Sequence, residues 1–127
     1  MVDVLESIFG PDPFSVYGAL VVDARFGFAL ENQTLSMFDS NFAVAGPLNE
    51  RIQVHELAHQ WVGNSVSLKQ WKDIWLNEGF ATYAEHLWLE RTQPSYNIGS
   101  AMASVATQRF VLIGQPGARC AVRSIGV

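Results

Sequence analysis

Two histidines, four positions apart, constrain this chain more than any other feature of its sequence. Residues 55–59 read HELAH, which places His55 and His59 one turn apart if the segment is helical. Side chains at positions i and i+4 share one helical face, so both imidazoles can point at a single metal ion. Apolar residues at helical spacing support such a helix: Ile52, Val54, Leu57, Ala58 and Trp61.

A catalytic zinc ion is typically held by three protein ligands, with a further position left open for water. The two histidines therefore need a third ligand, and Glu78 is the best candidate. The 18 residues between His59 and Glu78 are enough to leave the first helix and return on a second one packed beside it. Helical spacing predicts that second helix over about residues 76–91. The sequence thus predicts one Zn²⁺ per chain, bound by His55, His59 and Glu78.

The general base expected beside such a metal is Glu56, which follows His55 directly in the motif. Its carboxylate points to a different part of the helical face and can reach water at the metal without taking a coordination position. Taken alone, an HExxH motif also occurs by chance on exposed helices, where its histidines are ordinary surface residues. A third histidine, His86, fits a partly exposed helix position better than it fits a ligand.

The segments before the motif predict a helix followed by two strands. Residues 1–10 have apolar positions at helical spacing and are followed by prolines. Residues 17–24 contain a β-branched run typical of a buried strand, and residues 28–38 predict a second strand. Beyond the first motif, the alternating residues 66–68 form either a strand or a loop. The last residues, 114–127, have no clear periodicity, so we expect them to be irregular.

Three ordered motifs are similar to those of the gluzincin aminopeptidases of the aminopeptidase N type. HELAH and WLNEGFA, residues 75–81, are joined by the spacer of 18 residues, and GFALEN, residues 27–32, resembles the GAMEN segment of that family. The resemblance covers about residues 3–95. It implies an α+β fold, namely a fragment of a thermolysin-like catalytic domain within residues 1–127. In such a fragment, a short mixed sheet lines the cleft with its edge strand and lies beside two zinc-bearing helices.

The same resemblance implies an aminopeptidase that removes N-terminal residues from peptides with a free N-terminus. In the family, the backbone of the GAMEN strand pairs with the peptide, and the glutamate of that segment binds the α-amino group. These roles would fall on Glu31 and its neighbours Ala29, Leu30 and Asn32. Phe28 and Leu30 stand where the family has Gly and Met, which alters the shape of the cleft.

Part of the family architecture is missing from the sequence given. The tyrosine that stabilises the transition state in the family is expected beyond Val127, and the N-terminal β-rich and C-terminal helical domains are not represented. One alternative is therefore a zinc-binding but catalytically incomplete fragment. A thermolysin-like endopeptidase is a second alternative, against which WLNEGFA and the ALEN segment argue. An epoxide hydrolase, as among leukotriene-processing relatives, uses the same zinc site, and nothing in the sequence favours it.

Several other side chains have two interpretations. Thr82 and Glu85 lie one and two turns after Glu78 and either orient a ligand or belong to the plain helix surface. We expect the large aromatic residues to pack in the core rather than line a substrate pocket. These are Trp61, Trp75, Phe80 and Trp88, together with Tyr17, Tyr83 and Tyr96.

Composition excludes some classes of partner. The formal net charge of -4 and the lack of a Lys and Arg cluster argue against binding to nucleic acid or to an anionic membrane. No apolar stretch reaches the roughly 18 residues that a membrane-spanning helix needs. The single cysteine, Cys120, cannot form an internal disulfide, and the N-terminus lacks a secretory pattern. The expected location is therefore the cytoplasm.

Overall fold

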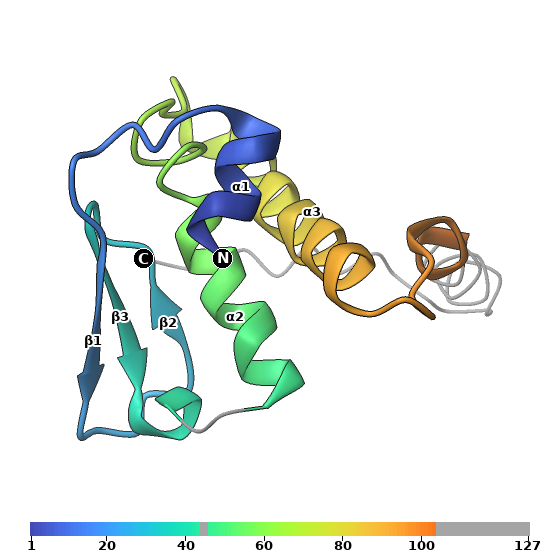
Figure 1. The fold of residues 1–127 in the computed structure, drawn as a ribbon. Coiled ribbons are helices and arrows are strands. Elements are labelled where there is room, and N and C mark those ends of the chain that lie inside the picture. The colour runs from blue at the N-terminus through green and yellow to red at the C-terminus, as the bar shows by residue number, and fades with distance from the viewer. Residues whose placement is uncertain (44–45, 104–127) are drawn as a thin grey trace, which may run out of the picture. The chain divides into compact units, whose positions relative to one another are not determined.

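A computed structural model describes residues 1–43 and 46–103 of the chain (Figure 1). The chain divides into two compact units, Met1–Pro94 and Ser95–Val127. In the second unit, residues 98–103 are helical. The segment 114–127, for which we expected irregular structure, and Cys120 lie outside the described residues. The first unit contains every residue of the predicted site.

The described residues of the first unit contain three α-helices. They are α1 (Val2–Phe9), α2 (Pro47–Ala58) and α3 (Trp75–Thr92), with short 3-10 helices at Ser40–Ala43 and Trp71–Asp73. All three helices lie where the apolar spacing predicts them. Helix α2 begins with Pro47 in its first turn, where a missing backbone N–H costs nothing. No helix among the described residues is long and apolar enough to cross a membrane.

A small mixed sheet precedes α2. Its strands are β1 (Gly18–Val22), β2 (Ala29–Leu30) and β3 (Leu35–Asp39), in the order β1-β3-β2. Strand β1 runs parallel to β3, whereas β2 pairs with β3 in the antiparallel direction. The α+β class and the short mixed sheet are confirmed. Strand β2, which consists of Ala29 and Leu30, is an edge strand of this sheet (Figure 1).

The expectation of one strand over residues 28–38 is wrong. The chain reverses direction between β2 and β3, where the backbone N–H of Leu35 donates to the carbonyl of Asn32 at 3.1 Å. Thr34 has a φ of 64°, which no continuous strand allows. The turn consists of polar residues, ENQT, which suit a loop better than a strand interior. The apolar residues on either side, Phe28 to Leu30 and Leu35 to Phe38, masked this turn in the sequence.

Strand β1 lies where it was expected but is not buried. Leu20 and Val21 are 46% and 47% exposed, although the β-branched run predicted a buried strand. The stretch containing Val66 and Leu68 is a loop rather than a strand, with one isolated bridge between Val62 and Val66. A run of apolar residues identifies strand propensity but not the neighbours that would cover it.

The hydrophobic core lies where α2 packs between α1 and α3. Small residues at the contact of α2 with α3 let the two helices approach closely, and larger residues fill the remaining space. The buried members are Leu5, Val54, Leu57, Ala58, Trp61, Ala81 and Ala84. The indole N–H of Trp61 donates to the carbonyls of Gly10 and Pro11 at 3.0 and 3.1 Å. These contacts fix α2, and therefore the HELAH motif, against the end of α1.

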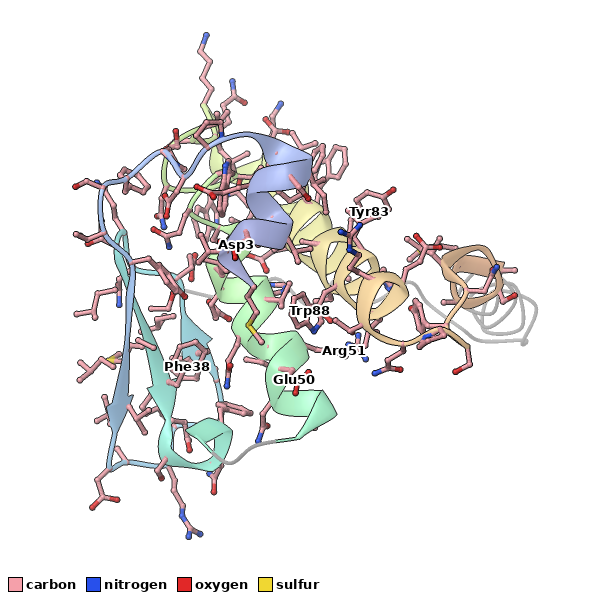
Figure 2. The ribbon with its side chains drawn as sticks, viewed as in Figure 1. Asp3, Phe38, Glu50, Arg51, Tyr83 and Trp88 are labelled. Atoms are coloured by element: carbon pink, nitrogen blue, oxygen red, sulfur yellow. The ribbon has the colours of Figure 1, made fainter. Side chains whose placement is uncertain are left out.

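The aromatic residues divide between the core and the surface. Trp61 is buried, and Trp88 packs against the core, as expected. Trp75 and Phe80 are 65% and 48% exposed, so their assignment to the core is wrong. Tyr83 is also exposed and projects outward from α3 (Figure 2), contrary to the expectation of packing. Both sides of α3 carry apolar residues, and the sequence does not say which side α2 covers.

Candidate metal centre

The three predicted zinc ligands come together between α2 and α3. One ligand atom from each of His55, His59 and Glu78 lies within 4.8 Å of the other two. Nε2 of His55 is 3.2 Å from Oε2 of Glu78, and Nε2 of His59 is 3.8 Å from Oε1 of the same carboxylate. The two imidazole rings meet edge to face with centroids 4.9 Å apart. Helix α2 therefore supplies His55, its C-cap residue is His59, and α3 supplies the carboxylate that faces both imidazoles.

Each histidine has its other ring nitrogen occupied by a hydrogen bond. Nδ1 of His55 donates to Oε1 of Glu85 at 2.8 Å, and Nδ1 of His59 donates to the carbonyl of Val62 at 3.0 Å. A partner at Nδ1 fixes both the ring orientation and the tautomer, which leaves Nε2 as the ligand atom. Both rings are thus already oriented as metal ligands.

Arg51 completes the support behind His55. Its guanidinium projects from α2 toward α3 (Figure 2) and donates to Oε2 of Glu85 through Nε at 3.0 Å and Nη2 at 2.7 Å. Burial raises the pKa of Glu85, but hydrogen bonds from His55 and Arg51 outweigh it and hold that pKa below its ordinary value. Glu85 therefore stays ionised. It holds the ring of His55, a candidate ligand, through the hydrogen bond at Nδ1, whereas Thr82 is exposed.

The carboxylates around His55 favour a positive charge at its ring. Burial lowers the pKa of His55, but hydrogen bonds to Glu78 and Glu85 raise it to about 9. The same hydrogen bond from His55 lowers the pKa of Glu78. Two carboxylates on either side of one imidazole thus create a site with a strong preference for positive charge.

Glu56 is the buried carboxylate of the centre, with only 7% of its surface exposed. Burial raises its pKa to about 7, His55 opposes that change, and the nearby carboxylates of Glu31, Glu78 and Glu85 add to it. A carboxylate whose pKa lies near neutrality is well suited to accept and return a proton.

A turn after α2 shapes the surroundings of His59. Gly63 has a φ of 129°, and a Cβ built there would lie 3.2 Å from Nδ1 and 3.4 Å from the carbonyl oxygen of His59. Only glycine combines this backbone conformation with so close an approach. Gly63 therefore makes room for the imidazole of His59.

The β2–β3 turn is attached to the residues that follow the second histidine. Gln60, which is fully buried, accepts a hydrogen bond from the backbone N–H of Thr34 at 2.8 Å. The side chain of Asn64 donates to the carbonyl of Glu31 at 2.6 Å. Sequence reasoning missed both amides. Their only signal is their position, one and five residues after His59, where polar side chains interrupt an apolar helix end.

The donor set fits zinc in chemistry and number. Two imidazole nitrogens and one carboxylate, with space left for water or substrate, are typical of catalytic zinc sites. Glu78 remains half exposed, so the centre opens to solvent. A hollow of about 430 Å³ lies elsewhere, between the N-terminus, the sheet and α2, and none of the three ligands lines it. The chemistry of the side chains, rather than the size of a cavity, identifies the site.

Comparison with protein families agrees with this centre. The chain matches the Peptidase family M1 domain over residues 11–113. It is 41% identical over 83 residues to Aminopeptidase N of Homo sapiens, a stretch covering 58% of this chain and 9% of that protein. It is 35% identical over 91 residues to Aminopeptidase M1-A of Oryza sativa subsp. japonica, with 69% and 10% covered.

Solved structures of M1 zinc metallopeptidases are also similar to this chain. The chain is similar to a mutant M1 zinc metallopeptidase from Deinococcus radiodurans crystallised with a Tyr-Ser-Ala substrate. The TM-score is 0.71 and the identity 41%, over 87% of this chain and 23% of that chain. A second structure of a mutant metallopeptidase from this organism gives 0.72 and 39%, with 93% and 25% covered. The chain therefore spans about a tenth of the curated relatives and about a quarter of the solved ones.

Proposed function

The chain belongs to peptidase family M1, and from this premise we propose that the protein it represents is a zinc-dependent aminopeptidase. In this proposal His55, His59 and Glu78 bind one zinc ion, and Glu56 is the general base. The observation that carries the proposal is the convergence of three ligand atoms within 4.8 Å, with both Nδ1 atoms already engaged elsewhere. An accidental HExxH on a surface helix would have neither feature.

Zinc bound at this centre would act as a Lewis acid on the scissile carbonyl and make a neighbouring water more acidic. Glu56 would accept a proton from that water and then donate it to the nitrogen of the leaving amine. Burial of Glu56 and the surrounding carboxylates support this role, because they bring its pKa to about 7 in the metal-free chain. One carboxylate can therefore serve as base and then as acid within a single turnover.

Glu31 would bind the free α-ammonium of the substrate. It follows the edge strand Ala29–Leu30, and its charge lies close enough to Glu56 to affect that pKa. A carboxylate fixed near the metal pairs with an ammonium and places the first peptide bond at the reacting centre. The unpaired side of β2 would pair with the backbone of the peptide, to which Asn32 would also contribute. This arrangement supports an exopeptidase rather than an endopeptidase.

For the isolated chain we propose zinc binding with little or no peptide turnover. The chain spans only about a tenth of its curated relatives, so other parts of the whole protein would be needed to complete the cleft. The tyrosine expected from the family resemblance falls beyond Val127. Tyr83, on α3, is exposed and projects outward from that helix (Figure 2).

The experiment compares substrates that differ only at the N-terminus. Zinc-loaded protein, as the isolated chain and within the longer polypeptide, is given an aminoacyl chromogenic amide and its N-acetylated form. We expect the longer polypeptide to cleave only the free-amine substrate, and Glu56→Gln to abolish cleavage while retaining zinc. Equal cleavage of the acetylated substrate would refute the aminopeptidase proposal, and full activity of the isolated chain would refute the proposal of an incomplete centre.

A further inference from the structure

The turn between β2 and β3 has an unusual backbone that is held by side chains from another element. Thr34 has a φ of 64°, a left-handed conformation that β-branched residues rarely adopt. Such a conformation persists only where the surroundings determine it strongly. Here Gln60 accepts a hydrogen bond from the N–H of Thr34 at 2.8 Å and donates to the carbonyl of Asn32 at 3.4 Å.

Asn64 adds a third hydrogen bond to this turn, at Glu31, whose carboxylate is the candidate binding group for the substrate amine. Its Nδ2 donates to the carbonyl of Glu31 at 2.6 Å. Its own backbone N–H donates to the carbonyl of His59 at 2.9 Å. A single residue therefore joins the backbone of Glu31 to the backbone of a zinc ligand. Gln60 directly follows the same candidate ligand, His59. We call the side chains of Gln60 and Asn64 together the amide clamp.

Pairing within the sheet is too short to give this positional control. Strand β2 has two residues, and only two residue pairs join it to β3. A two-residue edge strand is a weak constraint on the loop that follows it. The three amide hydrogen bonds from Gln60 and Asn64 outnumber the residue pairs of the strand. They run directly to the segment that orients the ring of His59 through the carbonyl of Val62.

We propose that Gln60 and Asn64 are positioning residues that set the distance between the carboxylate of Glu31 and the metal ligands. They thereby restrict the centre to ligands with a free ammonium one residue away from the zinc-binding group. The inference rests on the proposed function, since it assigns no contact with substrate to either amide. Both act through the backbone of the segment that carries Glu31. Loss of the clamp releases that segment and removes the preference for a free amine.

The test uses two ligands that need no catalysis. Leucine hydroxamate and its N-acetyl form both bind zinc through the hydroxamate, and only the first carries an ammonium. Dissociation constants are measured by calorimetry on the zinc-loaded chain. An ammonium paired with a partly buried carboxylate predicts a preference for the free amine of roughly 10-fold or more in wild type. We call this preference, the dissociation constant of the acetylated ligand divided by that of the free amine, the ratio. Glu31→Ala gives the ratio that remains without the carboxylate.

Asn64→Ala is the main variant, because Asn64 is only partly buried, and Gln60→Ala is the second. We expect Asn64→Ala to bring the ratio close to that of Glu31→Ala, while the affinities for zinc and for the acetylated ligand stay within about twofold. Ser67→Ala is the matched control. Its hydroxyl donates to the carbonyl of Gly63 in the same loop as Asn64. This control should keep the wild-type ratio.

Amide hydrogen exchange gives a readout that does not depend on ligand. Residues 31–35 of the zinc-loaded chain should exchange faster in Asn64→Ala than in Ser67→Ala or wild type. A wild-type ratio in both amide variants would overturn the inference and leave the proposed function intact. An equal loss of affinity for both ligands in the amide variants would also overturn it, because such a loss indicates general destabilisation of the site. A wild-type chain that binds zinc without preferring the free amine would overturn both the inference and the proposed role of Glu31.

Discussion

Oε1 of Glu85 lies 2.8 Å from Nδ1 of His55, on the opposite side of the ring from the carboxylate of Glu78. Helix α3 thus supplies both a candidate metal ligand and the group that orients another ligand, two turns apart on one helix. The second oxygen of Glu85 is held by Arg51 of α2. The two helices are therefore linked by a polar network that passes through the metal centre as well as by their shared core.

Removal of this orienting group should weaken metal binding. Glu85→Ala is expected to lower zinc affinity by about 10- to 100-fold, because the ring of His55 loses its fixed orientation and tautomer. Glu85→Gln should lose less, since an amide oxygen still accepts a hydrogen bond from Nδ1. Competition with a chromogenic chelator measures the affinities. Glu90→Ala, an exposed carboxylate on the same helix, is the control, and equal affinities in both alanine variants would contradict the prediction.

The metal-free chain should become less stable as pH rises from about 7 to about 9.5. The folded pKa of His55 is about 9 and the unfolded value about 6.5, so the folded chain retains a proton that the unfolded chain has lost. Stability from this proton is present below the unfolded value and is lost as pH passes the folded one. The expected loss is on the order of 2 kcal/mol, discounted for partial exposure. Urea unfolding in chelator measures it.

The control for this pH dependence is His55→Asn, which removes the titrating ring. Its unfolding free energy should change much less over the same range. Glu56 does not obscure the comparison, because its folded pKa of about 7 places its contribution at lower pH. Stability that rises with pH in the metal-free wild type would contradict the assigned protonation of His55.

Two glycine substitutions should have opposite effects on stability. Gly63→Ala is expected to destabilise the fold by about 1–3 kcal/mol and to weaken zinc binding. Its Cβ would lie 3.2 Å from Nδ1 of His59 at a φ of 129°. Gly79→Ala, on α3 with nothing within 4 Å, should instead stabilise by up to about 1 kcal/mol because alanine favours a helix. Thermal unfolding compares them, and equal effects would contradict the role given to Gly63.

Zinc should stabilise the folded chain, because the three ligands lie on two helices and converge only after folding. At a free zinc concentration of about 100 times the dissociation constant, the gain is about 2.7 kcal/mol. Differential scanning calorimetry with and without chelator measures this shift. His59→Ala should remove most of the gain. His86→Ala, on α3 outside the predicted ligand set, should retain it.

The metal centre was largely predictable because its signal is local. The spacing of His55 and His59 within one helical turn, and the second helix with Glu78, depend on short-range periodicity that sequence displays directly. The structure brings these three residues together as the pattern predicts. The orienting role of Glu85 was only one of two interpretations, since helical spacing alone cannot show which residue of α2 it meets.

Features set by long-range contacts were not predictable. The turn at residues 31–34 depends on Gln60, which is 26 residues from Thr34 in sequence, so the local pattern alone predicts a single strand over residues 28–38. The exposure of Trp75 and Phe80 depends on which face of α3 meets α2. Composition gives both faces of that helix an apolar character, and only packing distinguishes them.

The central claim is that His55, His59 and Glu78 bind one zinc ion, and X-ray absorption at the zinc edge tests it most directly. Purified chain with one equivalent of zinc should show two imidazole nitrogens at about 2.0–2.1 Å from the zinc ion and oxygen ligands at a similar distance. Glu78→Ala should lower the affinity for zinc but keep the imidazole signal. Retention of zinc with unchanged affinity and spectrum in His59→Ala, or no zinc binding by wild type, would contradict the account.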